Sequence, residues 1–368
     1  MEQRNTLHKA RRVVIKVGTS LVTSADGSLA LGRLGALCEE LVTLRGQGRE
    51  VLLVSSGAVG LGRKRLGLRE RPTDTATRQA CAAVGQGSLL AFYDTLLSHL
   101  GVPCAQVLLT EHDFLDRHRY LNLAAALERL LALGALPILN ENDTVSVDEI
   151  ALGRDRVFGD NDRLSALVAS NLDADLLVLL TNVDGVYTGP PGSPAAERIV
   201  TWTDQKVEFG QLSDGGTGGM QAKIAAARIA SSAGVPTIIA SGLETDTLSA
   251  VLRGEDRGTL IPAGPAQRRH HRWLAHATAT DAHAVINQGA VEALRKSGAS
   301  LLPIGVQQIV GDFVSGAIID VRDASGRSVA RGVAAYSSER VSSIMGTAGH
   351  KPLIHRDKLV LLDGGHDG

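Results

Sequence analysis

Short apolar runs alternate with longer segments of helical periodicity between residues 10 and 262. Runs rich in β-branched residues and leucine are typical of strands buried on both faces of a parallel sheet. The longer segments carry apolar residues three or four positions apart, which predicts helices that cover the sheet. The predicted strands are 13–17, 50–54, 103–109, 136–139, 175–180 and 236–240, and the predicted helices are 31–46, 76–100 with an interruption at 85–87, 121–133, 164–170 and 221–233. We therefore expect an α/β fold, a mostly parallel sheet sandwiched by helices, with ligands at the carboxyl ends of the strands.

The pattern changes after residue 262. A Gly, Pro, Arg and His-rich stretch over 263–272 has the composition of a linker. Short strands, one helix over 288–297 and a hairpin over 317–333 follow, and they predict a small β-barrel-like domain. We expect a first domain over 1–262, a linker over 263–272 and a second domain over 273–364.

A lysine stands in the middle of the first apolar run, which reads Val13-Val14-Ile15-Lys16-Val17. A buried ammonium group is costly unless it meets an anion or reaches water. Two interpretations stay open on this run alone: Lys16 extends to solvent near the N-terminus, or it reaches a phosphate at the carboxyl end of the strand.

Small and polar residues follow several predicted strands, where backbone N–H groups can face a ligand. The segments are 55–62, 140–143, 159–166 and 214–220, and Lys223 follows the last of them on the first turn of a predicted helix. A glycine-rich loop before a helix N-terminus with a lysine can bind phosphate. The alternatives are a flexible loop with a surface lysine at 214–223 and a simple helix cap at 160–162.

Composition narrows the classes of protein. The 368 residues carry 38 Lys and Arg against 39 Asp and Glu, a net charge of −1, so no global field attracts nucleic acid or a membrane surface. Three widely spaced cysteines argue against disulfides or a zinc site. No apolar run is long enough to span a bilayer, and we expect a cytoplasmic protein.

The candidate chemistry is phosphoryl transfer. Neither a P-loop nor a dinucleotide-binding glycine motif is present. Two distant lysines, anion-binding turns and a carboxylate cluster, with no histidine or cysteine nucleophile beside them, suit a reaction that depends on positioning and charge neutralisation. An acceptor that is itself an ionised carboxylate needs no general base.

Five motifs in order resemble the amino-acid kinase family, in particular its members that phosphorylate glutamate. They are Lys16-Val17-Gly18-Thr19-Ser20, Ser55-Ser56-Gly57-Ala58, Asn140-Glu141-Asn142-Asp143, Gly159-Asp160-Asn161-Asp162 with Leu164-Ser165-Ala166, and Gly216-Thr217-Gly218-Gly219-Met220 with Lys223. The segment from about Trp273 to Leu362, with Gly289-Ala290-Val291-Glu292-Ala293-Leu294, resembles the PUA domain of bacterial members. The resemblance covers nearly the whole chain.

This resemblance implies ATP-dependent phosphorylation of the side-chain carboxylate of L-glutamate to γ-glutamyl phosphate, the first step of proline synthesis. It implies that Lys16 and Lys223 bind the phosphates and that Asp162 holds both lysines. The implied glutamate ligands are Ser56, Asp143, Asp160 and Asn161, and the implied nucleotide ligands are Lys16, Thr181, Asn182, Thr217, Gly218, Gly219, Met220, Gln221, Ala222 and Lys223.

The resemblance also implies partners and cofactors. Mg²⁺ would bridge the phosphates of ATP, with substrate and water rather than protein side chains as its main ligands. Proline is implied as a feedback inhibitor, a dimer or tetramer as the assembly, and channelling to the next enzyme of the pathway. Three departures from the family are Asn182 in place of an aspartate, Ala222 in place of a hydroxyl residue, and a long segment over 144–158.

Two alternatives remain at this stage. Aspartate, acetylglutamate, carbamate and uridylate kinases share the expected fold and lysines. From another class, an RNA-binding or RNA-modifying protein could act through the PUA domain, although the neutral charge and 3% aromatic residues disfavour it.

Overall fold

The computed structural model of the chain describes residues 3–24, 26–110, 112–115, 117–145, 161–191, 193, 196–203, 219–264 and 282–362. The chain folds as two compact units, Met1–Ala266 and Gln267–Gly368. The division falls inside the segment 263–272 for which a linker is predicted, and positions 265–272 lie outside the described residues.

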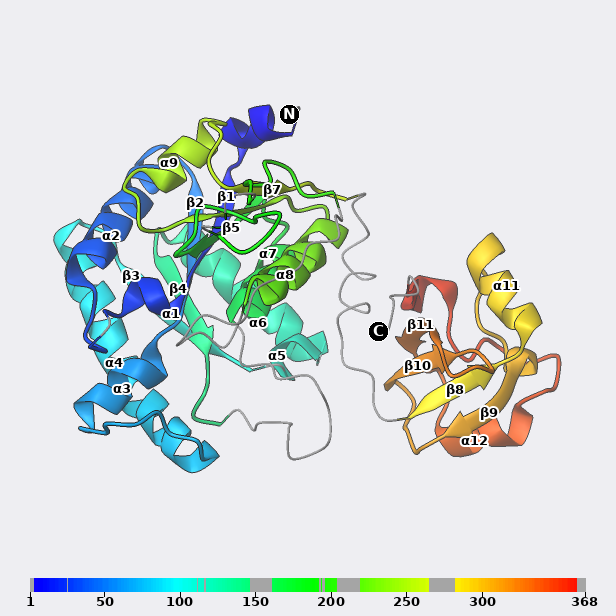
Figure 1. Cartoon of the computed structure of the whole chain (residues 1–368). Coiled ribbons are helices and arrows are strands. Elements are labelled where there is room, and N and C mark those ends of the chain that lie inside the picture. Colours follow the sequence, from blue (N-terminus) through cyan, green and yellow to red (C-terminus); the bar gives the residue numbers. More distant parts are fainter. Residues whose placement is uncertain are drawn as a thin grey trace. The chain divides into compact units, whose positions relative to one another are not determined.

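A seven-stranded sheet forms the centre of the first unit (Figure 1), in the order β3-β4-β2-β1-β5-β6-β7. All neighbours pair in parallel except β6 and β7, which are antiparallel. The strands are β1 (Arg12–Val17), β2 (Glu50–Ser55), β3 (Cys104–Leu109), β4 (Leu136–Glu141), β5 (Leu176–Thr181), β6 (Thr237–Ser241) and β7 (Thr259–Ile261). Because β1 lies between β2 and β5, it marks the point where the strand order reverses, the usual place for a ligand in such sheets.

Helices cover both faces of this sheet (Figure 1), which confirms the predicted fold class. The helices are α1 (Thr19–Val22), α2 (Leu31–Gly46), α3 (Ala58–Arg65), α4 (Thr75–His99), α5 (His112–Leu115), α6 (Arg117–Ala132), α7 (Asn161–Asn171), α8 (Met220–Ser232) and α9 (Thr247–Leu252), with the 3-10 helix η1 (Arg4–Lys9). Helices α2, α4 and α9 share one apolar core with the strands, whereas α7 and α8 pack together against β1, β5 and β6.

Helix α4 is continuous, so the predicted interruption at 85–87 is wrong. Gly85 is buried where α4 meets α3, and a Cβ atom there would overlap the carbonyl oxygen of Ala58. The glycine therefore permits close helix packing and does not break the helix. Helix α3 itself was not predicted, because its segment carries many small residues and little apolar periodicity.

The second unit contains a five-stranded sheet in the order β12-β11-β10-β8-β9. Its elements are β8 (His283–Ile286), α11 (Gln288–Ser297), η3 (Pro303–Gly305), β9 (Val306–Val310), β10 (Ile318–Arg322), β11 (Ser328–Val333), α12 (Ser338–Ile344), η4 (Arg356–Lys358) and β12 (Leu359–Leu361). The predicted helix and the predicted hairpin are both present, and the unit has its own apolar core.

Candidate active site

Lys16 extends from β1 toward the carboxyl edge of the sheet. Val13, Ile15 and Val17 face the core shared with α2 and α4, so the strand alternation turns Lys16 to the opposite face, where α7 lies. Its side chain is 6% exposed, and its Nζ is 2.6 Å from Oδ1 of Asp162. Extension to solvent, one of the two interpretations of the sequence, is therefore wrong.

Asp162 lies in the first turn of α7 and is fully buried. Its Oδ1 pairs with Lys16, and its Oδ2 accepts a hydrogen bond of 3.0 Å from Nζ of Lys223. Burial alone would raise the pKa of this carboxyl, but the two ammonium groups outweigh burial and hold the pKa below its usual value. Asp162 is therefore a carboxylate that neutralises two lysines from distant parts of the chain.

Lys223 reaches this carboxylate from the first turn of α8. The helix begins after Gly219, whose backbone is extended and which has no side chain to cap the first-turn N–H groups. Lys223 is 8% exposed. Two buried ammonium groups thus lie beside the N-terminal turn of a helix, an arrangement that favours a multiply charged anion such as a polyphosphate.

A second polar cluster lies next to this carboxylate, where β2 and β4 end. Nδ2 of Asn161 donates to Oγ of Ser56 at 2.9 Å, to the carbonyl oxygen of Ser55 at 3.3 Å and to Oδ1 of Asn140 at 3.0 Å. Asn161 directly precedes Asp162 on α7, so the cluster adjoins the two lysines. The structure thus brings together five of the predicted site residues, Lys16, Ser56, Asn161, Asp162 and Lys223.

Two members of this cluster were missed as site residues. Asn140 is 1% exposed and donates through Nδ2 to Oε1 of Gln86 at 2.7 Å. Gln86 lies in α4 among small residues. The sequence offered one signal for it: Gln86 lies one turn before Leu89 and two turns before Tyr93, on the helix face that packs against the sheet.

Seven further predicted residues lie at the same edge of the sheet. Thr181 ends β5, the strand beside β1, and its Oγ1 donates to Oδ1 of Asn182 at 3.3 Å. Asp143 follows β4 by two residues and is half-buried. Gly219, Met220, Gln221 and Ala222 form the start of α8. Asp160, Thr217 and Gly218, and most of the long segment 144–158, lie outside the described residues.

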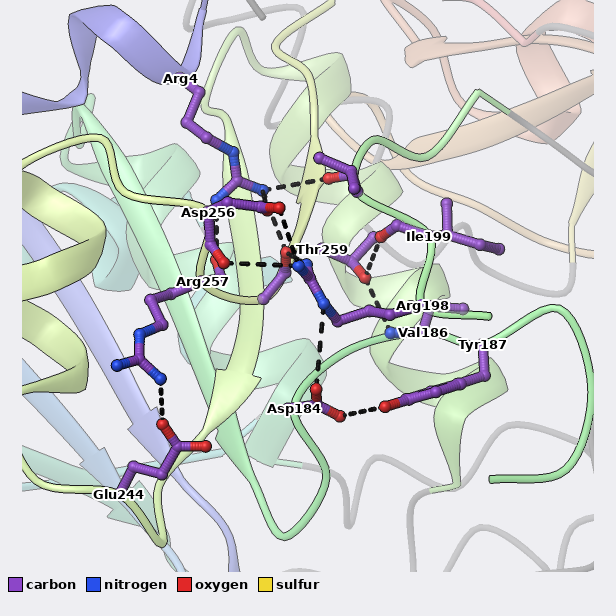
Figure 2. Close-up of polar contacts among 12 residues, drawn as sticks. Arg4, Asp184, Val186, Tyr187, Arg198, Ile199, Glu244, Asp256, Arg257 and Thr259 are labelled. Carbon is purple, nitrogen blue, oxygen red and sulfur yellow. Dashed lines mark hydrogen bonds and ion pairs between the residues drawn. The ribbon is translucent and has the colours of Figure 1, made fainter. Parts of the chain in front are cut away.

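A polar network joins residues that follow β5 and β6 to residues that precede β7 (Figure 2). Arg198 is 3.0 Å from Asp256 and 3.9 Å from Asp184, and Arg257 pairs with Glu244. These charged groups line a cavity of about 100 Å³ with Ser241 and Thr247. These charged groups pair with one another across the cavity wall, and the side chains of Asp184, Asp256, Arg257 and Glu244 are about half-exposed.

Two buried lysines joined by one carboxylate at the switch point of a mostly parallel sheet form an arrangement that suits a polyphosphate ligand. The profile of the amino acid kinase family matches residues 11–241, and that of the PUA domain matches residues 282–354. The chain belongs to the amino acid kinase family, and its second unit is a PUA domain.

Several relatives match nearly the full length of the chain. Proteins named glutamate 5-kinase from Moorella thermoacetica and from Synechococcus sp. are each 45% identical to it, with coverage of 98% and 95% of this chain and of 99% and 98% of those proteins. A glutamate 5-kinase of Streptomyces coelicolor is 42% identical over 98% of both chains. Within the described part of the chain, no helix is long and apolar enough to cross a membrane.

Proposed function

We infer that this chain transfers the γ-phosphoryl group of ATP to the side-chain carboxylate of L-glutamate, which yields γ-glutamyl phosphate and ADP and begins proline synthesis. The main structural support is that Lys16 and Lys223 both pair with the carboxylate of Asp162. The relatives named glutamate 5-kinase support glutamate as the acceptor, in preference to the acceptors of other amino acid kinases.

The two lysines act on the transferred group. Each ammonium group has three N–H donors and pairs with one oxygen of Asp162, and in this proposal each also donates to phosphate oxygens. Negative charge spreads over the phosphoryl oxygens as the bond to ADP breaks, and two fixed cations stabilise that charge. Asp162 keeps both cations in place without binding the phosphate itself.

The acceptor brings its own nucleophile. A carboxylate oxygen of glutamate attacks the γ-phosphorus, the new O–P bond forms, and ADP leaves with the electrons of the broken bond. Since this carboxylate is ionised at neutral pH, the reaction requires no general base. Ser56, Asn161, Asp143 and Asp160 bind the amino acid in this proposal, and the acidic groups face its ammonium group.

In this proposal the nucleotide lies at the carboxyl ends of the strands, next to β5 and the start of α8. Thr181 and Asn182 at the end of β5 and the segment Thr217 to Lys223 at the start of α8 contact it in this proposal. Asn182 is exposed and uncharged, and Ala222 offers no hydroxyl group, so the backbone N–H groups of the α8 turn are the better phosphate donors here.

Mg²⁺ completes the proposed reactants and would neutralise the phosphate oxygens when bound. Among the described residues no group of three or more Asp, Glu, His or Cys side chains could hold a metal ion. Both oxygens of Asp162 face ammonium groups. These residues fit an ion whose ligands are phosphate oxygens and water.

We also propose proline as a feedback inhibitor, a dimer or tetramer as the assembly, and transfer of the reactive acyl phosphate to the next enzyme of the pathway. Cys38, Cys81 and Cys104 are free thiols, which supports the expectation of a cytoplasmic protein.

An acceptor screen with hydroxylamine tests the proposal, because hydroxylamine converts an acyl phosphate into a stable hydroxamate. We expect ATP-dependent hydroxamate formation with L-glutamate and background rates with aspartate, acetylglutamate and carbamate. Turnover of one of those acceptors without turnover of glutamate would contradict the proposed function.

A further inference from the structure

The hydrogen bonds around Asn161 fix which end of its amide faces a ligand. Its Nδ2 has two hydrogens and lies within hydrogen-bond distance of the Ser55 carbonyl, Ser56 Oγ and Asn140 Oδ1. A carbonyl oxygen can only accept, so Nδ2 must be the group that faces Ser55. Oδ1 of Asn161 is then the other end of the amide, and it is buried without a donor among the described residues.

Asn140 is oriented by the backbone in the same way. Its Oδ1 accepts from the backbone N–H of Glu141 at 2.9 Å, and an N–H can only donate. Nδ2 of Asn140 therefore faces α4, where its acceptor is Oε1 of Gln86 at 2.7 Å. Because Asn140 is 1% exposed, loss of this acceptor would leave a buried donor without a partner.

Helix α4 supports the cluster at two points. Gln86 holds Asn140 at the end of β4. Tyr93 is fully buried two turns further along, and its hydroxyl oxygen is 3.0 Å from Oγ of Ser55 at the end of β2. Residues seven apart share a helix face, so one rigid helix sets the position of both strand ends.

We propose that Gln86 is a positioning residue for the acceptor amino acid. It acts through Asn140 to keep the Asn161 amide in the orientation that presents Oδ1 as an acceptor, and an ammonium group of the substrate supplies the missing donor. Gln86 need not touch the substrate. The inference rests on the proposed function, and it adds to the acidic groups a second feature by which the site would distinguish an α-amino acid from the same dicarboxylate without an amino group.

The test uses the full-length chain and compares L-glutamate with glutarate, which lacks the amino group. Gln86→Met removes the acceptor at similar side-chain volume. We expect this variant to lose about tenfold in kcat/KM for glutamate, mainly through a higher KM, with the KM for ATP unchanged. Its kcat/KM for glutarate should change by less than about threefold, because glutarate makes no bond to Oδ1.

Two variants serve as controls. Gln86→Glu retains an acceptor for Asn140 and should keep the KM for glutamate within about threefold of that of the wild type. Gln106→Met makes the same substitution at an exposed position of β3 and should change no kinetic parameter. Thermal unfolding of each variant shows whether the fold is intact.

The outcomes separate this inference from the proposed function. If the wild type forms no γ-glutamyl hydroxamate, the proposed function fails. The positioning role is contradicted if the wild type is active and Gln86→Met keeps its KM for glutamate. It is also contradicted if Gln86→Met loses the same factor in kcat/KM with glutamate and with glutarate. A Gln86→Glu variant as impaired as Gln86→Met would also contradict it.

Discussion

Asp162 is the residue on which the charge balance of the site depends. It is fully buried and pairs with two buried lysines, so its removal leaves two ammonium groups in a region of low dielectric constant. The phosphates of ATP can take over its neutralising role. The stability of the ligand-free protein should therefore depend on Asp162 more strongly than that of the ATP complex.

We predict that Asp162→Asn lowers the free energy of unfolding by about 3 kcal/mol at neutral pH without nucleotide. Saturating ATP should stabilise the variant more than it stabilises the wild type, because the phosphates meet uncompensated positive charge. Urea unfolding with and without ATP measures both effects. Asp94→Asn, an exposed aspartate of α4, should change stability by less than about 0.5 kcal/mol. Equal stabilisation by ATP in variant and wild type would contradict this charge balance.

The same carboxylate sets a pH dependence. Its pKa in the folded protein is lowered, so the stability it contributes is present above its unfolded pKa of about 3.9 and is lost as the pH falls through the folded value. We expect the stability difference between wild type and Asp162→Asn to narrow below about pH 4. Unfolding curves at pH 7 and pH 3 measure this, and a difference that stays constant would show that the pKa of Asp162 is the same in the folded and the unfolded protein.

The sequence indicated some of these residues better than others. Lys16 was conspicuous because a charge interrupts an apolar strand, and Lys223 because a glycine-rich segment precedes its helix. Gln86 gave only a weak signal, its position on the apolar face of a helix, because a glutamine in a helix is ordinary and its partner Asn140 is 54 positions away. Contacts between side chains on different elements require the register of strand and helix, which periodicity alone does not supply.

Among the secondary-structure elements, the contact between α3 and α4 depends on glycine, which has no side chain. A Cβ at Gly85 would overlap the Ala58 carbonyl oxygen, whereas Gly87, two residues further along, has no atom within 4 Å of such a Cβ. The sequence suggested a helix break at both glycines. It could not separate them because the distinction lies in tertiary packing, which overrides intrinsic helix propensity.

These two glycines give a matched pair of variants. Gly85→Ala should destabilise the protein by about 2 kcal/mol or more, because backbone must move to admit the methyl group. Gly87→Ala should stabilise it by about 0.5–1 kcal/mol, because alanine loses less conformational entropy in a helix. Urea unfolding of both variants measures the difference, and a stable Gly85→Ala variant would show that the helices can separate at little cost.

The N-terminal element η1 is attached partly through Arg4, besides Leu7 in the apolar core. Arg4 of η1 is buried near Asp256 and Arg257 (Figure 2). Its guanidinium donates to the carbonyl oxygens of Val200, Glu255, Arg257 and Gly258 at 2.8–3.0 Å. Arg4→Met would leave these acceptors without their charged donor. We expect a loss of about 2 kcal/mol in unfolding free energy. Lys9→Met, at an exposed position of the same element, should have almost no effect, and equal effects in both would contradict the tethering role of Arg4.

At the scale of the whole molecule, the alternation of strands and helices predicted the parallel sheet, and the change of pattern after residue 262 predicted a second unit. The edge strand β7 escaped prediction because three residues give no periodicity, and its antiparallel pairing depends on β6. The sequence could not supply the distances between residues that are far apart in the chain. Residues 16, 162 and 223 converge only because β1, α7 and α8 meet at one edge of the sheet.

Every residue proposed to bind ATP or glutamate lies in the first unit, which has its own apolar core. We therefore expect a chain that ends at Gly264 to fold and to keep glutamate-dependent turnover within about tenfold of the full chain. Hydroxamate formation and circular dichroism measure activity and folding. A folded truncation with no activity would place an essential function in the PUA domain.

The phosphate-binding role of the two lysines is tested by the rate of ATP-dependent γ-glutamyl hydroxamate formation in Lys16→Ala, Lys223→Ala and the double variant. Each single variant should lose roughly 10²-fold or more in kcat with its fold intact, and the double variant should lose less than the product, because both cations act on one phosphoryl group. Lys64→Ala, which removes a half-exposed surface lysine, should keep the wild-type rate. Wild-type turnover in either Lys16→Ala or Lys223→Ala would contradict the claim that these lysines bind the transferred phosphoryl group.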